Sequence, residues 1–557
     1  MVPNRSGYHL HHDRARPCIE EISINEVLPA DSVAVTSSST TPTISTPSGP
    51  GSGYQSGPVS PASPPTEAGE APPRPYSSTL TKSQKHFILF IATLVSFFSA
   101  LSSRIYYPIL PTLVENYSLT TTLLNLSITT YMLLQGVAPV LVGPFSDKYG
   151  RRAGYILCLV IHILSNICLA IQNSYPALMV LRGLQALGAS GLVSLGYVVV
   201  SDIAATPKER QKFTPILAGG VLFADILGPV LGGLLGRYAG WRSVFWFLAA
   251  AAGGLMLVYW LFVPEMKRSA IVVAGNGDQG RVVKMWWMVE GIRLLKRADF
   301  TDDDNNTIPT RAQRISSNPR EAVSILLEPT AFILILSIGL LMLMNIAFRT
   351  STPTLFSEIY GFDSLQIGLC FLPLGIGASI GAICNGYLLD WNYRRHAGQL
   401  NLTETSNPEE PEPGAEVETE RTISQADLPT ISLEKARLQP LVPLLLLTIS
   451  TITPYGFVLS RTQNSGTNLS IAIPLVLQAL NSFALSACAN TLTTLLIDLF
   501  PSQPATAAAT AAKLVQCWLG AIGAGVVQDM LLGLGREWCF VLLGGLVALA
   551  GLGACVI

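Results

Sequence analysis

Ten residues between two apolar runs, GPFSDKYGRR at 143–152, indicate the fold of this chain because their pattern occurs twice. The segment GYLLDWNYRR at 386–395 also follows an apolar run and keeps the spacing G-x-x-x-D-x-x-x-R-R, 243 residues further on. A second pattern, R-x-x-x-P, begins at Arg104 and again at Arg349, a displacement of 245 residues. Patterns that return in the same order indicate an internal repeat, so we expect two similar halves.

Charged residues are scarce outside three stretches of the chain. They make up 13% of the 557 residues, whereas an ordinary soluble domain carries about 25%. The stretches 1–82, 264–328 and 391–438 hold 45 of the 71 Asp, Glu, Lys and Arg residues, and the other 362 residues hold 26. This low charge excludes a soluble enzyme and most peripheral membrane proteins.

The low-charge part divides into twelve apolar runs, each about as long as the roughly 20 residues of a membrane helix. Six runs precede the polar stretch 264–328, at about 86–108, 123–142, 153–172, 176–200, 214–236 and 241–263. Six follow it, at about 330–352, 364–389, 440–460, 470–496, 507–530 and 538–557. The fourth and tenth runs each lead to an aspartate, Asp202 and Asp498. We expect an all-α integral membrane protein with twelve transmembrane helices in two pseudo-symmetric six-helix bundles, which can rock about a central cavity.

The polar stretches mark the expected domain boundaries. Residues 1–82 are rich in Ser, Thr, Pro and Gly, which predicts a disordered cytosolic tail. Residues 83–263 form the N-terminal six-helix bundle, and 264–328 form a cytosolic central loop. Residues 329–557 form the C-terminal bundle, which contains an acidic cytosolic loop at 391–438.

The distribution of basic residues predicts the orientation in the membrane. With the N-terminus in the cytosol, 27 of the 35 Lys and Arg residues fall in cytosolic segments and four in external loops. We therefore expect a multi-pass protein of the plasma membrane with a cytosolic N-terminus. The external loops contain two N-x-S/T sequons, at Asn116 and Asn468, which are the predicted glycosylation sites.

Several classes of partner receive no support from the sequence. The net charge is −1, which gives no argument for nucleic acid, and eight of the nine cysteines lie in apolar runs without metal-like spacing. A G-x-x-x-x-G-K-[ST] phosphate-binding loop does not occur. We expect a monomer that is not an enzyme and that needs neither a cofactor nor a metal.

Ionised residues inside the apolar runs are functional candidates, because each costs at least about 2.5 kcal/mol at bilayer depth. The candidates are Arg104, Arg182, Asp225, Arg349 and Lys513, with His162 as a neutral possibility. Asp225 is the one carboxylate deep in a run. A carboxylate that is ionised in a wet cavity and protonated in a dry one can couple transport to protons. The alternative is a permanent salt bridge between Asp225 and an arginine that holds two helices together.

Arg104 and Arg349 occupy equivalent places in the repeat, one turn before a proline. Two guanidiniums that face one cavity suit a carboxylate or phosphate group, which suggests an organic anion. The alternative is that both arginines extend to the outer headgroups, as we also expect for Lys513 at the cytosolic side. His162 fits a hydrogen-bonded packing residue better than a proton relay. Uncharged polar residues that could face the cavity are Gln185, Asn345, Asn385, Gln478, Asn481, Asn490 and Gln516.

The repeated loop pattern resembles that of the major facilitator superfamily, and the resemblance covers nearly all of 86–557. In such proteins the aspartate and arginine of the loop form charge contacts with neighbouring helix ends and latch one conformational state. The resemblance places this latch at Gly143, Asp147, Gly150, Arg151, Arg152, Asp390, Arg394 and Arg395. The alternative is that these charges only set the orientation.

Two further patterns resemble those of proton-coupled antiporters. LRGLQALG at 181–188 is similar to a proton-coupling pattern, and GPVLGG at 228–233 is similar to a pattern characteristic of antiporters. Because proline removes a backbone hydrogen bond, the second pattern is expected to let the fifth helix bend. The residues of this bend are Gly228, Pro229, Gly232 and Gly233.

The chain thus resembles fungal members of the twelve-span drug:proton antiporter group. The resemblance implies a secondary active efflux transporter that exports a xenobiotic, toxin, secondary metabolite or organic acid in exchange for protons by alternating access. Its expected coupling and cavity residues are Asp225, Arg182, Gln185, Arg104 and Arg349. Proton-coupled nutrient uptake and a transporter-like receptor are the alternatives.

Overall fold

The computed structural model describes residues 82–204, 206–263, 326–405, 438–465, 470–499 and 505–556. All of these belong to one compact unit, Pro72–Ile557. The predicted N-terminal tail, nearly all of the central loop, most of the acidic loop and the sequon at Asn468 lie outside the described residues.

Every regular element in the described part of the chain is helical. The first half contains α1 (Lys82–Arg104), η2 (Tyr107–Ile109), α2 (Leu110–Tyr117), α3 (Thr121–Tyr149), α4 (Arg151–Ile171), α5 (Tyr175–Ile203), α6 (Pro207–Ala239) and α7 (Trp241–Phe262). The second half contains α10 (Pro329–Tyr360), α11 (Ser364–Cys370), α12 (Leu372–Thr405), α14 (Leu441–Ser465), α15 (Ala472–Leu499) and α16 (Ala505–Val556).

The described helices account for the expected twelve membrane passes. Eleven segments are long and apolar enough to cross a membrane, and the last of them, Thr510–Ala554, has 45 residues. This is about twice the length of one span. Its helix α16 is broken at Gly535, where φ is +80° and ψ is 165°. The two parts of α16 therefore make two passes, which confirms the all-α membrane fold.

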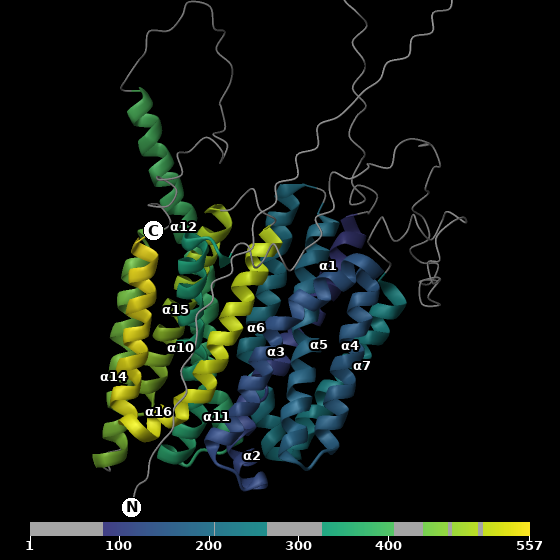
Figure 1. Ribbon diagram of the computed structural model, residues 1–557, viewed down its shortest axis with the longest axis vertical. Coiled ribbons are helices and arrows are strands. Elements are labelled where there is room, and N and C mark those ends of the chain that lie inside the picture. The colour runs from purple at the N-terminus through teal and green to yellow at the C-terminus, as the bar shows by residue number, and fades with distance from the viewer. Residues whose placement is uncertain are drawn as a thin grey trace, which may run out of the picture. The chain divides into compact units, whose positions relative to one another are not determined.

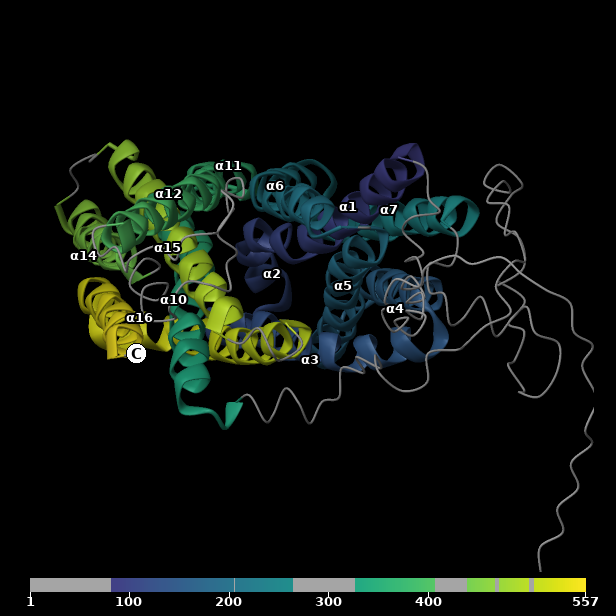
Figure 2. The same cartoon turned by 90° about the horizontal axis from the view of Figure 1, so that it is seen from above.

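Helices of the two halves meet along two seams. In the first half α5 packs against α1, α3 and α4, and in the second half α16 packs against α10 and α14, while α15 packs against α12 and α14. Across the halves, α3 contacts α16, and α6 contacts α11 and α12. Figures 1 and 2 show the purple-to-teal and green-to-yellow halves side by side. Helix α6, which also packs against α1, therefore lies at the boundary between the halves.

The side chains are arranged as a membrane requires. Large apolar residues such as Leu141, Trp246 and Leu446 are about half exposed or more, as expected for surfaces that face lipid tails. Polar residues such as Arg182 and Gln478 are almost fully buried. Polar chemistry is therefore concentrated inside the bundles and between them.

Candidate functional site

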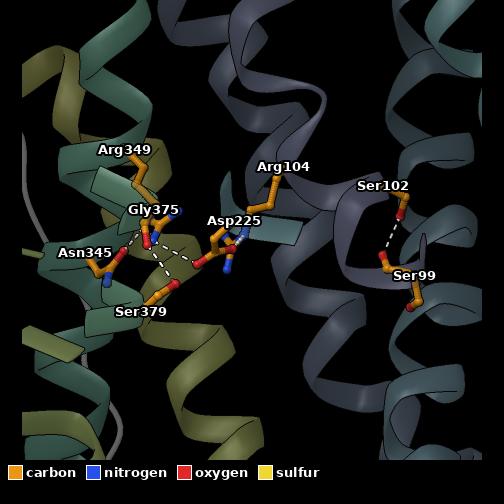
Figure 3. Close-up of polar contacts among 8 residues, drawn as sticks. All are labelled: Ser99, Ser102, Arg104, Asp225, Asn345, Arg349, Gly375 and Ser379. Carbon is orange, nitrogen blue, oxygen red and sulfur yellow. Dashed lines mark hydrogen bonds and ion pairs between the residues drawn. The ribbon is translucent and has the colours of Figure 1, made fainter. Parts of the chain in front are cut away.

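Asp225 connects three helices where the two halves meet. The Nε of Arg104, at the end of α1, donates a hydrogen bond to Oδ1 of Asp225 in α6. The Nη2 of Arg349 in α10 donates to the other carboxylate oxygen, Oδ2, at 3.1 Å. Figure 3 shows both arginine side chains turned toward Asp225. We call Arg104, Asp225 and Arg349 the charge triad.

The charge triad is largely buried and carries excess positive charge. Arg349 is 3% exposed and Asp225 is 8% exposed, and the side chain of Arg104 is 21% exposed. The Nε of Arg349 also donates to Oδ1 of Asn345 at 2.6 Å. Two guanidiniums share one carboxylate, so one positive charge has no acidic partner within the triad. Because a buried charge is costly unless it is paired, the triad is a candidate site for an anion.

Glycines bring the helices of the triad close together. A Cβ on Gly228 of α6 would lie 2.6 Å from Cβ of Arg104, and a Cβ on Gly375 of α12 would lie 2.8 Å from the backbone oxygen of Asp225. The hydroxyl of Ser379 donates to the carbonyl oxygen of Gly375 at 2.9 Å, as seen in Figure 3. Asp225 thus lies at a tight crossing of α6 with both α1 and α12.

The predicted bend residues of α6 lie where this helix contacts its neighbours on two sides. A side chain on Gly232 would overlap the carbonyl oxygen of Ile105, and one on Gly233 would overlap that of Ser364 in α11. Helix α6 itself continues through Pro229 from Pro207 to Ala239. The absence of side chains on these glycines is therefore needed for helix approach as much as for any bend.

Arg182 lies in a separate polar cluster within the first half. Its Nη1 donates to Oε1 of Gln185 at 2.5 Å, and its guanidinium lies 3.9 Å from the ring centre of Tyr106 and 4.4 Å from that of Tyr131. Gln185 in turn donates to Oδ1 of Asn166 at 2.7 Å. Among the described residues no carboxylate pairs with Arg182. We call these five residues the Arg182 cluster, in which two aromatic faces partly compensate the charge.

The other polar residues predicted for the cavity are distributed more widely. His162 is buried and its Nδ1 lies 3.4 Å from the backbone oxygen of Gln185, as a packing residue would. Asn345 contacts the triad. Of the predicted cavity residues in the second half, Asn385, Gln478 and Asn481 are buried, Asn490 is exposed, and Lys513 and Gln516 are half-buried. No cluster of three or more potential metal ligands occurs in the described part of the chain.

The first copy of the repeated loop forms a charge cluster. Arg151 donates from Nη1 to Oδ1 of Asp147 at 2.6 Å and from Nε to Oδ2 of Asp202 at 2.8 Å. Arg152 donates to the backbone oxygen of Trp260 at 2.6 Å. Arg151 therefore ties the end of α3 to the end of α5.

The second copy of the loop has a different structure. Asp390, Arg394 and Arg395 are exposed on α12. The guanidinium of Arg395 lies 5.6 Å from the ring centre of Trp391. The structure thus brings together the first half of the predicted latch and leaves the second half on a helix surface.

Polar contacts also join the halves at the end of the molecule that contains α2, which we call the α2 end. Thr112 shares a hydrogen bond of 3.0 Å with Ser364, and Arg237 forms an ion pair with Asp363. Nearby, Asn116 is exposed near the end of α2. The halves are therefore in direct contact at this end.

Four residues of the site were not predicted. Tyr106, Tyr131 and Asn166 belong to the Arg182 cluster, and Gly375 permits the close approach to Asp225. The position of Tyr106, two residues after Arg104, could have suggested proximity to the site. The other three residues carry no comparable signal, because their roles depend on which helix faces meet.

Comparisons with known proteins agree with this architecture. The family model described as Major Facilitator Superfamily matches residues 92–401. The MFS-type transporter phiD of a fungal species is 35% identical over 458 residues, and the match covers 82% of this chain and 65% of phiD. Citrate exporter 1 of Aspergillus niger is 32% identical over 490 residues, with 87% of each chain covered.

A solved structure shares the fold. A bacterial homolog of the human lysosomal transporter Spinster, in an inward-facing and unoccupied conformation, superposes with a TM-score of 0.57 at 15% identity. The match covers 86% of this chain and 97% of that one.

Proposed function

The chain belongs to the major facilitator superfamily and is a multi-span membrane transporter, and we propose that it exports a small organic anion in exchange for protons by alternating access. In this proposal it lies in the plasma membrane with its N-terminus in the cytosol and its α2 end outside. The observation that carries the proposal is the charge triad between the two halves.

The charge triad supports an anionic substrate. Arg104 and Arg349 come from different halves and meet on one carboxylate. A carboxylate of the substrate can replace Asp225 on Arg349, because it offers the same geometry for charge-assisted hydrogen bonds. The substrate then competes with an internal anion for the same guanidinium. One of the relatives is named a citrate exporter, which agrees with this class of substrate.

Asp225 also supports coupling to protons. Once its contacts with the arginines are broken, the carboxylate is ionised while water reaches it and takes up a proton when the site is dry, because burial disfavours the charged form. In our proposal Asp225 takes up a proton from the outer side and releases it to the cytosol. Because this carboxylate contacts both halves, its protonation state changes the link between them.

The contacts at the α2 end support alternating access. Thr112, Ser364, Arg237 and Asp363 join the halves there. Opening toward the α2 end must break these contacts, so a cycle of export has a defined step at which the outer side opens. The Arg349–Asp225 contact lies between the same two halves and must loosen in that step as well.

Efflux measurements on cells that produce the full chain test the proposal. Cells are preloaded with labelled citrate or with a labelled lipophilic cation and are placed in acidic or neutral medium, with and without a protonophore. We expect chain-dependent loss of citrate that increases in acidic medium and collapses with the protonophore.

Each other outcome contradicts a named part of the proposal. Efflux of the cation alone overturns the anionic substrate, and inward movement of citrate overturns export. Citrate efflux that responds to membrane potential and not to external pH overturns proton exchange. Flux of neither probe overturns export of this anion class and favours the receptor.

Asp225→Asn separates coupling from a structural salt bridge. We expect the pH response of efflux to be lost while folded protein remains. Because the variant leaves two buried guanidiniums without a carboxylate, it can also cost about 3–5 kcal/mol of stability, so Asp225→Asn combined with Arg349→Gln provides a second test. Asp529→Asn, an exposed carboxylate that accepts a bond from Thr122, is the matched control.

A further inference from the structure

The fourth helix of each half carries two buried polar residues at equivalent positions. Asp202 and Asp498 are 296 residues apart. The same displacement relates Arg182 to Gln478 and Gln185 to Asn481. Gln478 and Asn481 are 0% and 1% exposed. The second half therefore repeats the place of the Arg182 cluster but replaces its charge with a neutral amide.

The neutral copy is joined to the helix that carries Arg349. The Nε2 of Gln478 donates to Oγ1 of Thr352 at 3.3 Å and to the hydroxyl of Tyr455 at 3.2 Å. Since an α-helix turns about 100° per residue, Thr352 lies about 60° around α10 from Arg349. Arg349 itself forms an ion pair with Asp225 in the other half. Gln478 is thus bonded to a residue at the edge of the surface on which the charge triad lies.

The two copies differ in how completely their amides are hydrogen-bonded. In the first half, Oε1 of Gln185 accepts from Arg182 and its Nε2 donates to Asn166. In the second half, the buried polar atoms without a partner in the described part of the chain include Oε1 of Gln478, Nδ2 of Asn481 and Nη1 of Arg349. A buried polar atom without a partner costs about 1–3 kcal/mol. These three atoms therefore offer one acceptor and two donors to a bound molecule.

We propose that Gln478 and Asn481, supported by Tyr455 and Thr352, form a hydrogen-bonding subsite for an uncharged hydroxyl group of the transported anion. The inference rests on the proposed function, because Arg349 binds a carboxylate of the same substrate. A hydroxyl group matches the subsite since it can accept from the amide nitrogen of Asn481 and donate to the amide oxygen of Gln478. The substrate class becomes a hydroxylated carboxylate.

Two labelled probes with equal charge test the subsite. Citrate and propane-1,2,3-tricarboxylate differ only by one hydroxyl group, so their ratio of efflux KM values reports that group alone. We expect the wild-type chain to favour citrate and Gln478→Leu to reduce this preference about tenfold, the ratio that corresponds to one hydrogen bond of about 1.4 kcal/mol. Asn481→Leu is expected to act in the same direction.

A matched control variant separates a hydroxyl subsite from a general loss of transport. Gln528→Leu removes another buried amide, in α16, and should leave the preference unchanged. If Gln478→Leu and Asn481→Leu lower transport of both probes equally, the residues have a structural role and the subsite is overturned. A wild-type chain that exports both probes without preference also overturns it, while proposed anion export stands. A wild-type chain that exports neither overturns the anion class itself and the subsite with it.

Discussion

The two halves carry the same ten-residue pattern at equivalent helix ends, yet the two copies fold differently. In the first half, α3 ends at Tyr149 and Arg151 bonds to both Asp147 and Asp202. In the second half, α12 continues to Thr405, and Asp390 forms no ion pair among the described residues. Matching charges are therefore not sufficient to build the cluster.

One position explains the difference. Gly150 and Tyr393 are equivalent, at the displacement of 243 residues that relates the two copies. Gly150 has φ +104° and ψ 158°, a conformation that is essentially restricted to glycine. It reverses the chain, so that α4 starts at Arg151 and the guanidinium returns to α3 and α5. Tyrosine disfavours that conformation, and the helix continues through Tyr393. The glycine determines the cluster, and the charges then stabilise it.

Alanine at two glycines, one in each copy of the pattern, should change the stability of the chain in opposite directions. Gly150→Ala places a side chain at a glycine-specific conformation, so we expect a loss of about 1–3 kcal/mol. Gly386→Ala lies in α12 where an added Cβ meets no atom within 4 Å. It should raise stability by up to about 1 kcal/mol through helix propensity. Thermal unfolding midpoints of the purified chain should shift in opposite directions. A shift of both in one direction would show that backbone conformation is not the cause.

The equivalent arginines should also respond unequally. Arg151→Ala leaves the partly buried carboxylates of Asp147 and Asp202 without this guanidinium. Hydrogen bonds to charged groups contribute about 1.5–3 kcal/mol, so we expect the transport rate to fall about tenfold if the cluster latches one state. Arg394→Ala removes an exposed charge and should change the rate less than about twofold. Equal losses in the two variants, at equal protein levels, would contradict a latch restricted to the first half.

The sequence predicts the positions of the charges better than their partners. Depth within the apolar runs singles out Asp225, and the repeat relates Arg104 to Arg349. The contacts of Asp225 with the two arginines depend on which helix faces meet. Those faces meet through close approaches at Gly228 and Gly375. Spacing along the chain does not determine such approaches between distant helices.

The same limit applies to the fourth helices of the two halves. The pattern at 181–188 places Arg182 among the coupling residues, whereas the structure encloses it between Tyr106 and Tyr131, apart from the charge triad. A polar residue on a buried helix has several possible neighbours, and its rotamer is selected by tertiary packing. The repeat nevertheless predicts that Gln478 occupies the equivalent place. Sequence symmetry therefore locates polar positions, and packing assigns their partners.

Two ion pairs near the α2 end differ in whether they join the two halves. Arg237 pairs with Asp363 across the halves, whereas Arg536 pairs with Glu358 within the second half. Each pair is partly exposed, so it contributes less than about 1 kcal/mol. Arg237→Ala should still favour opening of the α2 end, because the closed state alone contains its ion pair, whereas Arg536→Ala should not.

Labelling of a cysteine at position 112 by an impermeant thiol reagent measures this opening. Thr112 bonds to Ser364 across the same contact, and Cys168→Ala removes an exposed thiol from the background. We expect Thr112→Cys to be labelled up to about fivefold faster with Arg237→Ala, as follows from less than about 1 kcal/mol, and at an unchanged rate with Arg536→Ala. High salt should reduce the difference, since it screens exposed charges. Equal acceleration by both variants would mean that the α2 end responds to local charge and not to the contact between the halves.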